Sequence, residues 1–366
     1  MNNNYRKLLA AICVLLLSAC GSSGDDENDK DNSQNGYQAP ELINATVITD
    51  AVSNSYLSDF GCTGYNSGSI SDTAVESENF IVVTSSVYTS SEDEMHLLAT
   101  YAELALEEQL TRYDISASDL NIHDSNSKVL VCSDDTITNN ATGSYEGVNY
   151  YGVNGASVSS IGVTYNPNSS FRETLKHEIS HTVDIRLSSI GAESKGIDRL
   201  HRWMSEGLAE VSASRNESYA QATYSIVSER LSGNGGRNPL DDTFTYSNTK
   251  YELYLAAVKY LITPVNEGGA GNILADIVSM FQLMKTTAQG LNDYHIANYG
   301  HPIDWRCEYN FGCYEEIMYE YLGEEISVFE YAFQQTFTKD GLPLTYQELR
   351  DNFYDGELWY ISFLNR

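Results

Sequence analysis

The sequence predicts an α+β protein with two lobes, and three observations lead to this prediction. Short runs of β-branched and aliphatic residues, typical of strands, fall between residues 79 and 165. After residue 170 the apolar residues recur at helical spacing. Residues 170–186, a predicted helix with the pattern H-E-x-x-H, lie between the strand-rich region and the helical region. We expect an α+β lobe over residues 41–190 and a mainly helical lobe over residues 191–366, with a cleft between them.

Residues 1–19 are predicted to be a signal peptide. Arg6 and Lys7 precede an apolar run over residues 8–17, which is too short to span a bilayer. The run ends in L-S-A-C at Cys20, which resembles the lipobox of bacterial lipoproteins. This resemblance implies cleavage before Cys20, acylation of its thiol and anchorage in a membrane. An ordinary secretory signal is the alternative.

The location follows from the same resemblance. No Asp follows Cys20, so we expect an outer-membrane or cell-surface lipoprotein, with the periplasmic face of that membrane left open. Residues 20–40 are acidic and almost without apolar side chains, and we expect a disordered tether. Calcium is a second candidate ion for this acidic segment, although we favour a solvated spacer. The formal net charge of -30 argues against a nucleic-acid partner.

The N-terminal lobe is predicted to contain several short strands and one helix. Residues 79–85, 128–132 and 159–165 have the composition of strands, and residues 146–151 are a weaker candidate. Residues 92–113 predict a helix, because one side of it is apolar.

Residues 170–186, SFRETLKHEISHTVDIR, predict the central helix. Ser170 and Glu173 match a capping box, and Leu175, Ile179 and Val183 recur at core-facing positions. This helix carries the pattern H-E-x-x-H.

The pattern H-E-x-x-H predicts a metal site. His177 and His181 lie one turn apart on one face, so both imidazoles can reach one ion. Glu178 can then take a proton from a water molecule at that ion. The alternative is a solvated polar helix with two chance histidines.

A second helix, predicted over residues 202–212, supplies a third ligand. Catalytic zinc usually takes three protein ligands, and Glu206 is the natural third. Glu210 lies one turn further on the same face, where its carboxylate can accept the spare N–H of a ligating histidine. Taken alone, this segment would be an ordinary acidic helix face.

H-E-x-x-H followed by W-x-x-E-G-x-A-E resembles the gluzincin zinc metallopeptidases, and most of all the peptidase domain of microbial collagenases. The resemblance implies a thermolysin-like two-lobed fold and one catalytic zinc ion. It implies His177, His181 and Glu206 as ligands, Glu178 as general base, and Glu210 as the carboxylate behind the ligands.

The same resemblance implies two further features. A tyrosine in the helix predicted over residues 250–261 would stabilise the oxyanion, and Tyr251 matches better than Tyr254. His295 and His301, expected on loops, are alternatives for that role. The strand before the zinc helix would be an open sheet edge that pairs with substrate backbone.

The rest of the helical lobe is predicted from two apolar periodic segments. Residues 273–286 and 326–337 are expected to be helices, and residues 267–272 a glycine-rich turn.

Four cysteines remain after the leader and Cys20 are set aside. Cys307 and Cys313 are close in sequence and are predicted to pair, which leaves Cys62 with Cys132. An oxidising compartment favours both disulfides.

The sequence therefore predicts a zinc-dependent endopeptidase that hydrolyses protein or peptide substrates at the cell surface. The chief alternative is a surface binding or adhesion lipoprotein built on an inactive peptidase fold, and a zinc hydrolase of non-peptide substrates is the second. Triple-helical collagen is not the expected substrate, because no activator or collagen-binding module is recognised around the core.

Overall fold

The computed structural model gives one compact unit over residues 41–366. It describes residues 40–53, 57, 70–85, 90–122, 127–133, 151–153, 156–158, 160–163, 169–190, 200–213, 240, 251–303 and 311–354. The predicted leader, the lipidation site Cys20 and the predicted tether lie outside these residues. Among the described helices, none has both the length and the apolar character that crossing a membrane requires.

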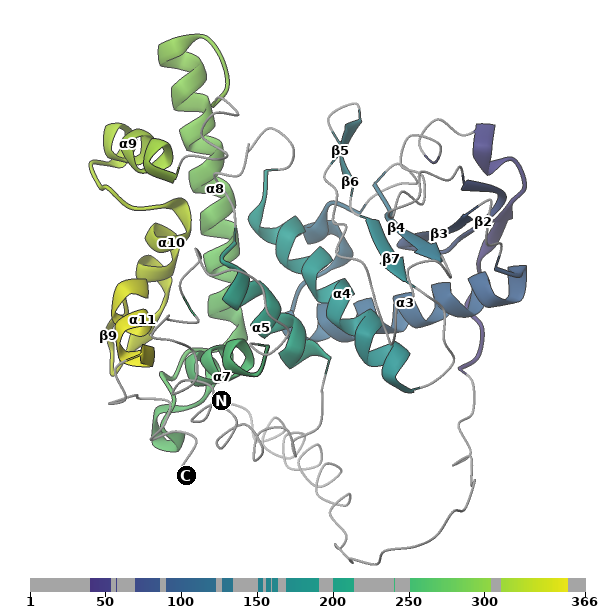
Figure 1. The fold of residues 1–366 in the computed structure, drawn as a ribbon, viewed down its shortest axis with the longest axis horizontal. Coiled ribbons are helices and arrows are strands. Elements are labelled where there is room, and N and C mark those ends of the chain that lie inside the picture. Colours follow the sequence, from purple (N-terminus) through teal and green to yellow (C-terminus); the bar gives the residue numbers. More distant parts are fainter. Residues whose placement is uncertain are drawn as a thin grey trace, which may run out of the picture. The chain divides into compact units, whose positions relative to one another are not determined.

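A five-stranded mixed sheet forms one side of this unit (Figure 1). Its order is β1-β2-β3-β4-β7, with β1 to β3 antiparallel and both β4 and β7 added in parallel. The strands are β1 (Thr46–Ile48), β2 (Ile70–Glu76), β3 (Phe80–Ser85), β4 (Val129–Ser133) and β7 (Ser160–Val163). Two short hairpins are separate from it: β5 (Tyr151–Val153) with β6 (Ala156–Val158), and β8 (Thr338–Lys339) with β9 (Leu342–Pro343).

The predicted strands at 79–85, 128–132 and 159–165 are confirmed as β3, β4 and β7. The weaker candidate at 146–151 overlaps β5 only at Tyr151, and its other residues are not described. Within the described strands β7 pairs with β4 alone, so it lies at the edge of the sheet.

Successive side chains of the sheet point to opposite faces, and each face is covered by a hydrophobic core. Phe80 and Val82 face the main core with helix α3 (Glu92–Tyr113), whereas Ile81 and Val83 belong to a smaller core on the other face. The N-terminus of α3 is fixed by a capping box, in which Ser91 and Glu94 each accept from the other's backbone N–H.

Four helices pack in series: α3 against α4 (Ser169–Ser188), α4 against α5 (Arg202–Ser212), and α5 against α7 (Tyr251–Ile262). The predicted helices in this region are confirmed. The predicted capping box of Ser170 is wrong, because α4 begins at Ser169 and Ser170 lies inside its first turn.

The C-terminal ends of α4 and α5 are held by cations from other helices. Lys285 Nζ donates to the carbonyl oxygen of Arg186 in α4 at 3.0 Å. Arg112 of α3 donates to the carbonyl oxygen of Val211 in α5 at 2.8 Å. These carbonyls belong to the last turns, whose oxygen atoms have no partner within their own helix.

Helix α8 (Leu274–Tyr299) packs against α4, α9 (Phe311–Leu322) and α10 (Val328–Thr336). The prediction that this helix ends at residue 286 is wrong. Buried Thr287, Ala288 and Leu291 continue the helical pattern, and α8 ends only at Gly300, which has a positive φ of 79°. Helix α11 (Tyr346–Tyr354) packs against α10.

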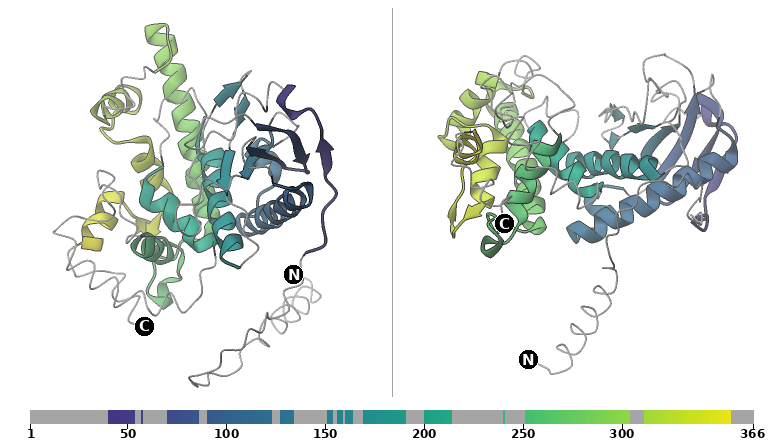
Figure 2. Two further views of the ribbon diagram at one scale, coloured as in Figure 1. Left: turned by 45° about the vertical axis from the view of Figure 1, so that its right-hand side comes forward. Right: turned by 60° about the horizontal axis from the view of Figure 1, so that its bottom comes forward.

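The described residues thus form an α+β fold that is mostly helical, with a small mixed sheet and eight α-helices (Figures 1 and 2). The α+β prediction is confirmed at this level.

Candidate metal centre

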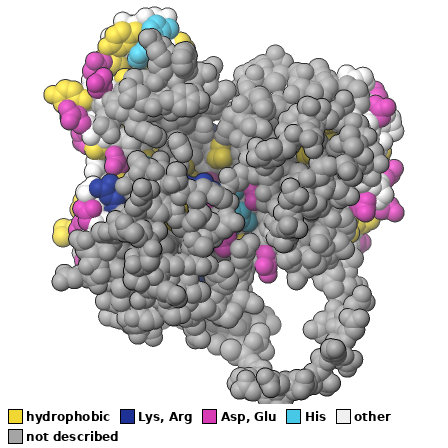
Figure 3. Space-filling view, in the orientation of Figure 1, with side chains coloured by type: hydrophobic (Ala, Val, Ile, Leu, Met, Phe, Trp, Pro, Cys, Tyr) yellow, Lys and Arg dark blue, Asp and Glu magenta, His cyan; other side chains and the backbone are white. Residues whose placement is uncertain are grey.

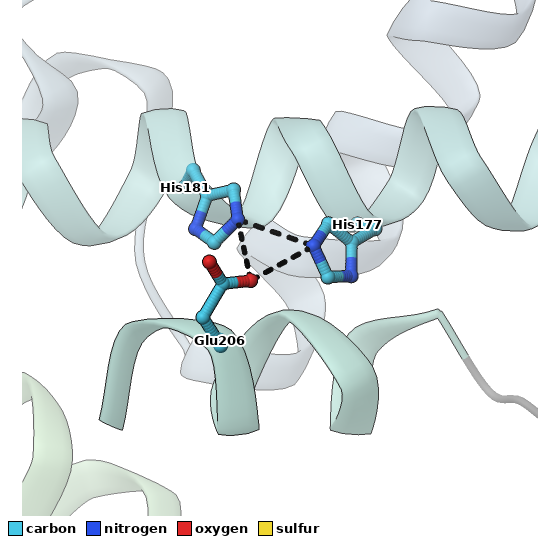
Figure 4. A group of neighbouring side chains, drawn as sticks. All are labelled: His177, His181 and Glu206. Atoms are coloured by element: carbon cyan, nitrogen blue, oxygen red, sulfur yellow. Dashed lines mark hydrogen bonds and ion pairs between the residues drawn. The ribbon is translucent and has the colours of Figure 1, made fainter. Parts of the chain in front are cut away.

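Three side chains from α4 and α5 meet in the interior (Figure 4). His177 and His181 point from α4 toward α5, and Glu206 points back between them. All three are buried, with 7%, 6% and 3% of their surface exposed. Helical spacing places both histidines on one face, and the packing of α4 on α5 supplies the carboxylate.

The ligand atoms converge closely. Glu206 Oε2 lies 3.3 Å from His177 Nε2 and 3.5 Å from His181 Nε2, and the two Nε2 atoms are 3.2 Å apart. All three atoms lie within 4.8 Å of one another, so this group can hold a metal ion. Two imidazole nitrogens and one carboxylate oxygen are a donor set that suits zinc, although other divalent transition metals accept it too.

The other nitrogen of each ring faces a polar partner. His177 Nδ1 lies 3.2 Å from Glu210 Oε1, and His181 Nδ1 lies 2.9 Å from Ser205 Oγ. Partners of this kind fix the tautomer and the orientation of a metal-binding histidine. Sequence reasoning singled out Glu210 and missed Ser205, which directly precedes Glu206 in α5 but gave no distinct signal.

The second oxygen of Glu206 is also engaged. Arg202 donates to Glu206 Oε1 at 3.2 Å, one turn along α5. The carboxylate therefore presents Oε2 toward the histidines and Oε1 toward the guanidinium. Sequence analysis missed Arg202, although an Arg and a Glu four residues apart on a helix are a recognisable pair.

The carboxylates around His177 and His181 favour a positive charge at the candidate metal site. Burial lowers the pKa of His177, but Glu206 and Glu210, helped by the charge of Glu178, outweigh burial and raise it to about 10. Burial also opposes protonation of His181, while Glu206 and Glu178 raise its pKa. A cation at this position is stabilised by the same carboxylates, and the histidine protons must leave before an ion can bind.

Glu178, the predicted base, lies beside His177 on α4 and is 5% exposed. Tyr254, one candidate for the oxyanion role, is buried in α7, the helix that packs against α5. Tyr251 begins α7, but its side chain is not among those described.

His295 and His301 do not join the described metal cluster. The expectation that His295 lies on a loop is wrong, because it belongs to the last turns of α8. His301 directly follows Gly300, where the helix ends.

A buried polar network adjoins the metal site and was not predicted. Ser212 of α5 donates to Gln109 of α3 at 2.9 Å and lies 3.2 Å from Ser180 of α4. Asp184, one turn after Ser180, is fully buried, and neither of its oxygen atoms has a hydrogen-bond partner among the described residues. Burial, only partly offset by the two site histidines, raises the pKa of Asp184 to about 8.

Cys132 lies in β4, facing the smaller core, and takes part in a disulfide. The pairing with Cys62 stays a prediction, because Cys62 is not described. Cys307 also lies outside the described residues, and the side chain of Cys313 is not described.

Comparison with protein-family models, with curated proteins and with solved structures finds no match to this chain.

Proposed function

We propose that this protein is a zinc-dependent endopeptidase of the gluzincin type with a thermolysin-like two-lobed architecture, acting on protein or peptide substrates. The observation that carries the proposal is the buried group of His177, His181 and Glu206, with Glu178 next to it in the chain. A structural metal site would need no adjacent carboxylate, and a catalytic one needs a base.

A bound ion and the side chains of the protein would have separate roles in the reaction. A bound zinc ion would supply Lewis acidity and lower the pKa of a water molecule. Glu178 would act as general base: it would take a proton from the attacking water molecule and pass that proton to the leaving amine. Glu210 orients the imidazole of His177, and Ser205 orients that of His181.

The edge strand β7 supports an extended substrate. It precedes α4 in the chain and has a free side within the described sheet, as Figure 1 shows. A substrate strand that pairs there is bound through its main chain, and such pairing tolerates many side chains. The substrate class follows from this geometry: unfolded segments of proteins, or peptides.

A tyrosine hydroxyl is proposed to share the developing oxyanion. Tyr254 and Tyr251 are the two candidates, since α7 packs directly on the helix that carries Glu206. Replacing each with Phe separates them: the residue that acts lowers kcat with little change in zinc content, and the other variant stays near wild type.

The decisive experiment compares the wild type with Glu178→Gln on casein and gelatin, with zinc content measured on both. We expect cleavage by the wild type alone and about one equivalent of zinc in the site of each protein. Activity retained by Glu178→Gln would remove the base assignment. Zinc without cleavage by either protein would instead favour the binding or adhesion lipoprotein.

We also propose that Cys20 is acylated and anchors the chain in the outer membrane or at the cell surface. Labelled palmitate should reach the wild type and not Cys20→Ser. Equal labelling of the two proteins would contradict the anchor.

A further inference from the structure

Two histidines meet at the C-terminal end of α8, apart from the metal centre described above. His295 lies in the last turns of α8, and His301 follows Gly300, where the chain turns back. Their ring centroids are 4.9 Å apart at an interplanar angle of 65°. Figure 3 shows histidine and apolar side chains together at this end of the molecule's surface.

The backbone fixes which nitrogen of each ring is available. His295 Nδ1 donates to the carbonyl oxygen of His301 at 2.9 Å, and His301 Nδ1 donates to that of Pro302 at 2.8 Å. A carbonyl oxygen can only accept, so in the neutral rings the lone pair is on Nε2. Neither Nε2 makes a hydrogen bond or an ion pair with a described residue. Metal-binding histidines are commonly held in this way, with the second ring nitrogen donating to a backbone carbonyl.

The ring centroids of this pair are about as far apart as those of the first pair, in which the two Nε2 atoms also approach to 3.2 Å. The rings of His177 and His181 have centroids 4.8 Å apart at an angle of 87°. The two pairs differ by 0.1 Å in separation, although one is formed within a helix and the other across a helix end.

The neighbouring side chains hold the second pair in place while leaving it accessible. Tyr299 lies against His295, with ring centroids 4.7 Å apart, and its hydroxyl donates to Glu320 of α9 at 2.8 Å. His301 is exposed and His295 is partly exposed.

We propose that His295 and His301 form a second, surface site for a transition-metal ion that accepts imidazole ligands, such as Zn²⁺, Cu²⁺ or Ni²⁺. Water molecules complete the coordination. The ion joins the last turns of α8 to the residues after Gly300. This site is independent of the proposed peptidase activity.

The first test counts bound zinc by equilibrium dialysis of the full-length, chelator-treated chain over a range of free Zn²⁺. Wild type should bind two ions, the second more weakly, whereas His295→Gln and His301→Gln should each bind one. His96→Gln, which removes a histidine from α3, should still bind two. Glu206→Gln should lose the tighter ion and keep the weaker, so failure of the first site is told apart from failure of the second.

The second test reads the ligands directly, and its main measurement is made on the wild type. One equivalent of Cu²⁺ is added to wild type whose tighter site already holds Zn²⁺. The electron paramagnetic resonance spectrum should show coupling to two imidazole nitrogens, and His295→Gln should show fewer. A copper spectrum without imidazole coupling, or equal zinc binding by wild type and both histidine variants, would overturn the proposal.

Discussion

Gly207 lies directly against the backbone of Tyr254. A β-carbon at Gly207 would come within 2.5 Å of the Tyr254 carbonyl oxygen and 2.6 Å of Val258 Cγ2. Helices α5 and α7 therefore approach closely at the residue that follows the candidate ligand Glu206, and only glycine fits there. Glu206 is the residue next to this contact in the chain.

We predict that Gly207→Ala separates α5 from α7. The free energy of unfolding should fall by about 1–3 kcal/mol, as for overpacked cores, and zinc affinity should fall as well. Denaturant unfolding and a zinc titration measure the two effects. Adding Val258→Ala should restore only part of the loss, because the carbonyl contact remains; full recovery would show that the Val258 side chain alone sets the distance.

Replacing Glu210 with Ala is predicted to weaken zinc binding by about 10- to 100-fold, because His177 loses the carboxylate that orients its ring. Competition with a chelator of known affinity measures the change. Ser205→Ala is the matched variant for His181 and should cost less, since a neutral hydroxyl is a weaker partner than a carboxylate. Unchanged affinity in Glu210→Ala would remove that residue from the site.

Asp184 should make the stability of the metal-free protein fall as pH rises. Its pKa is raised to about 8 in the fold from an ordinary value of 3.8, so the folded state keeps a proton that the unfolded state has lost. The contribution of this proton to the free energy of unfolding is fully present below about pH 4. It declines as the pH rises toward 8, by at most about 1.4 kcal/mol per pH unit. Asp184→Asn should flatten that slope in urea unfolding at pH 4 to 8. An equal slope in both proteins would refute the assignment.

Ser91→Ala should destabilise α3 by about 1 kcal/mol, because it removes the capping box. Thermal unfolding monitors this loss. Ser279→Ala, at an exposed position inside α8 where the hydroxyl bonds only to the carbonyl of Ala275, is the control and should be close to neutral. Similar losses in the two variants would mean that the cap contributes nothing specific.

The ligand group was predictable because each part of it is a local pattern. Helical spacing puts His177 and His181 on one face, and a carboxylate in the next predicted helix completes the set. What the sequence could not supply were partners that depend on how helices pack. Ser205 reaches His181 only through the register of α5 against α4. Arg202, in contrast, meets Glu206 within α5, as an i,i+4 pair that the sequence already contains.

The missed parts of the fold have similar causes. Strand β2 contains two charged residues and a register shift, so it lacks a clear strand pattern. Helix α8 runs past residue 286 through a polar stretch, where burial against neighbouring helices supports it more than its own composition does. Asp184 gave no signal, because a single acidic residue in a helix is usually solvated.

The contacts of Lys285 and Arg112 with the ends of α4 and α5 bear on how the proposed metal site would gain and lose an ion. Cations at these ends complement the helix dipoles and anchor both ligand-bearing helices to the rest of the core without any help from a metal. The binding site is thus shaped before the ion arrives. Chelation should empty it without melting the fold, and zinc added back should restore the loaded protein without a refolding step.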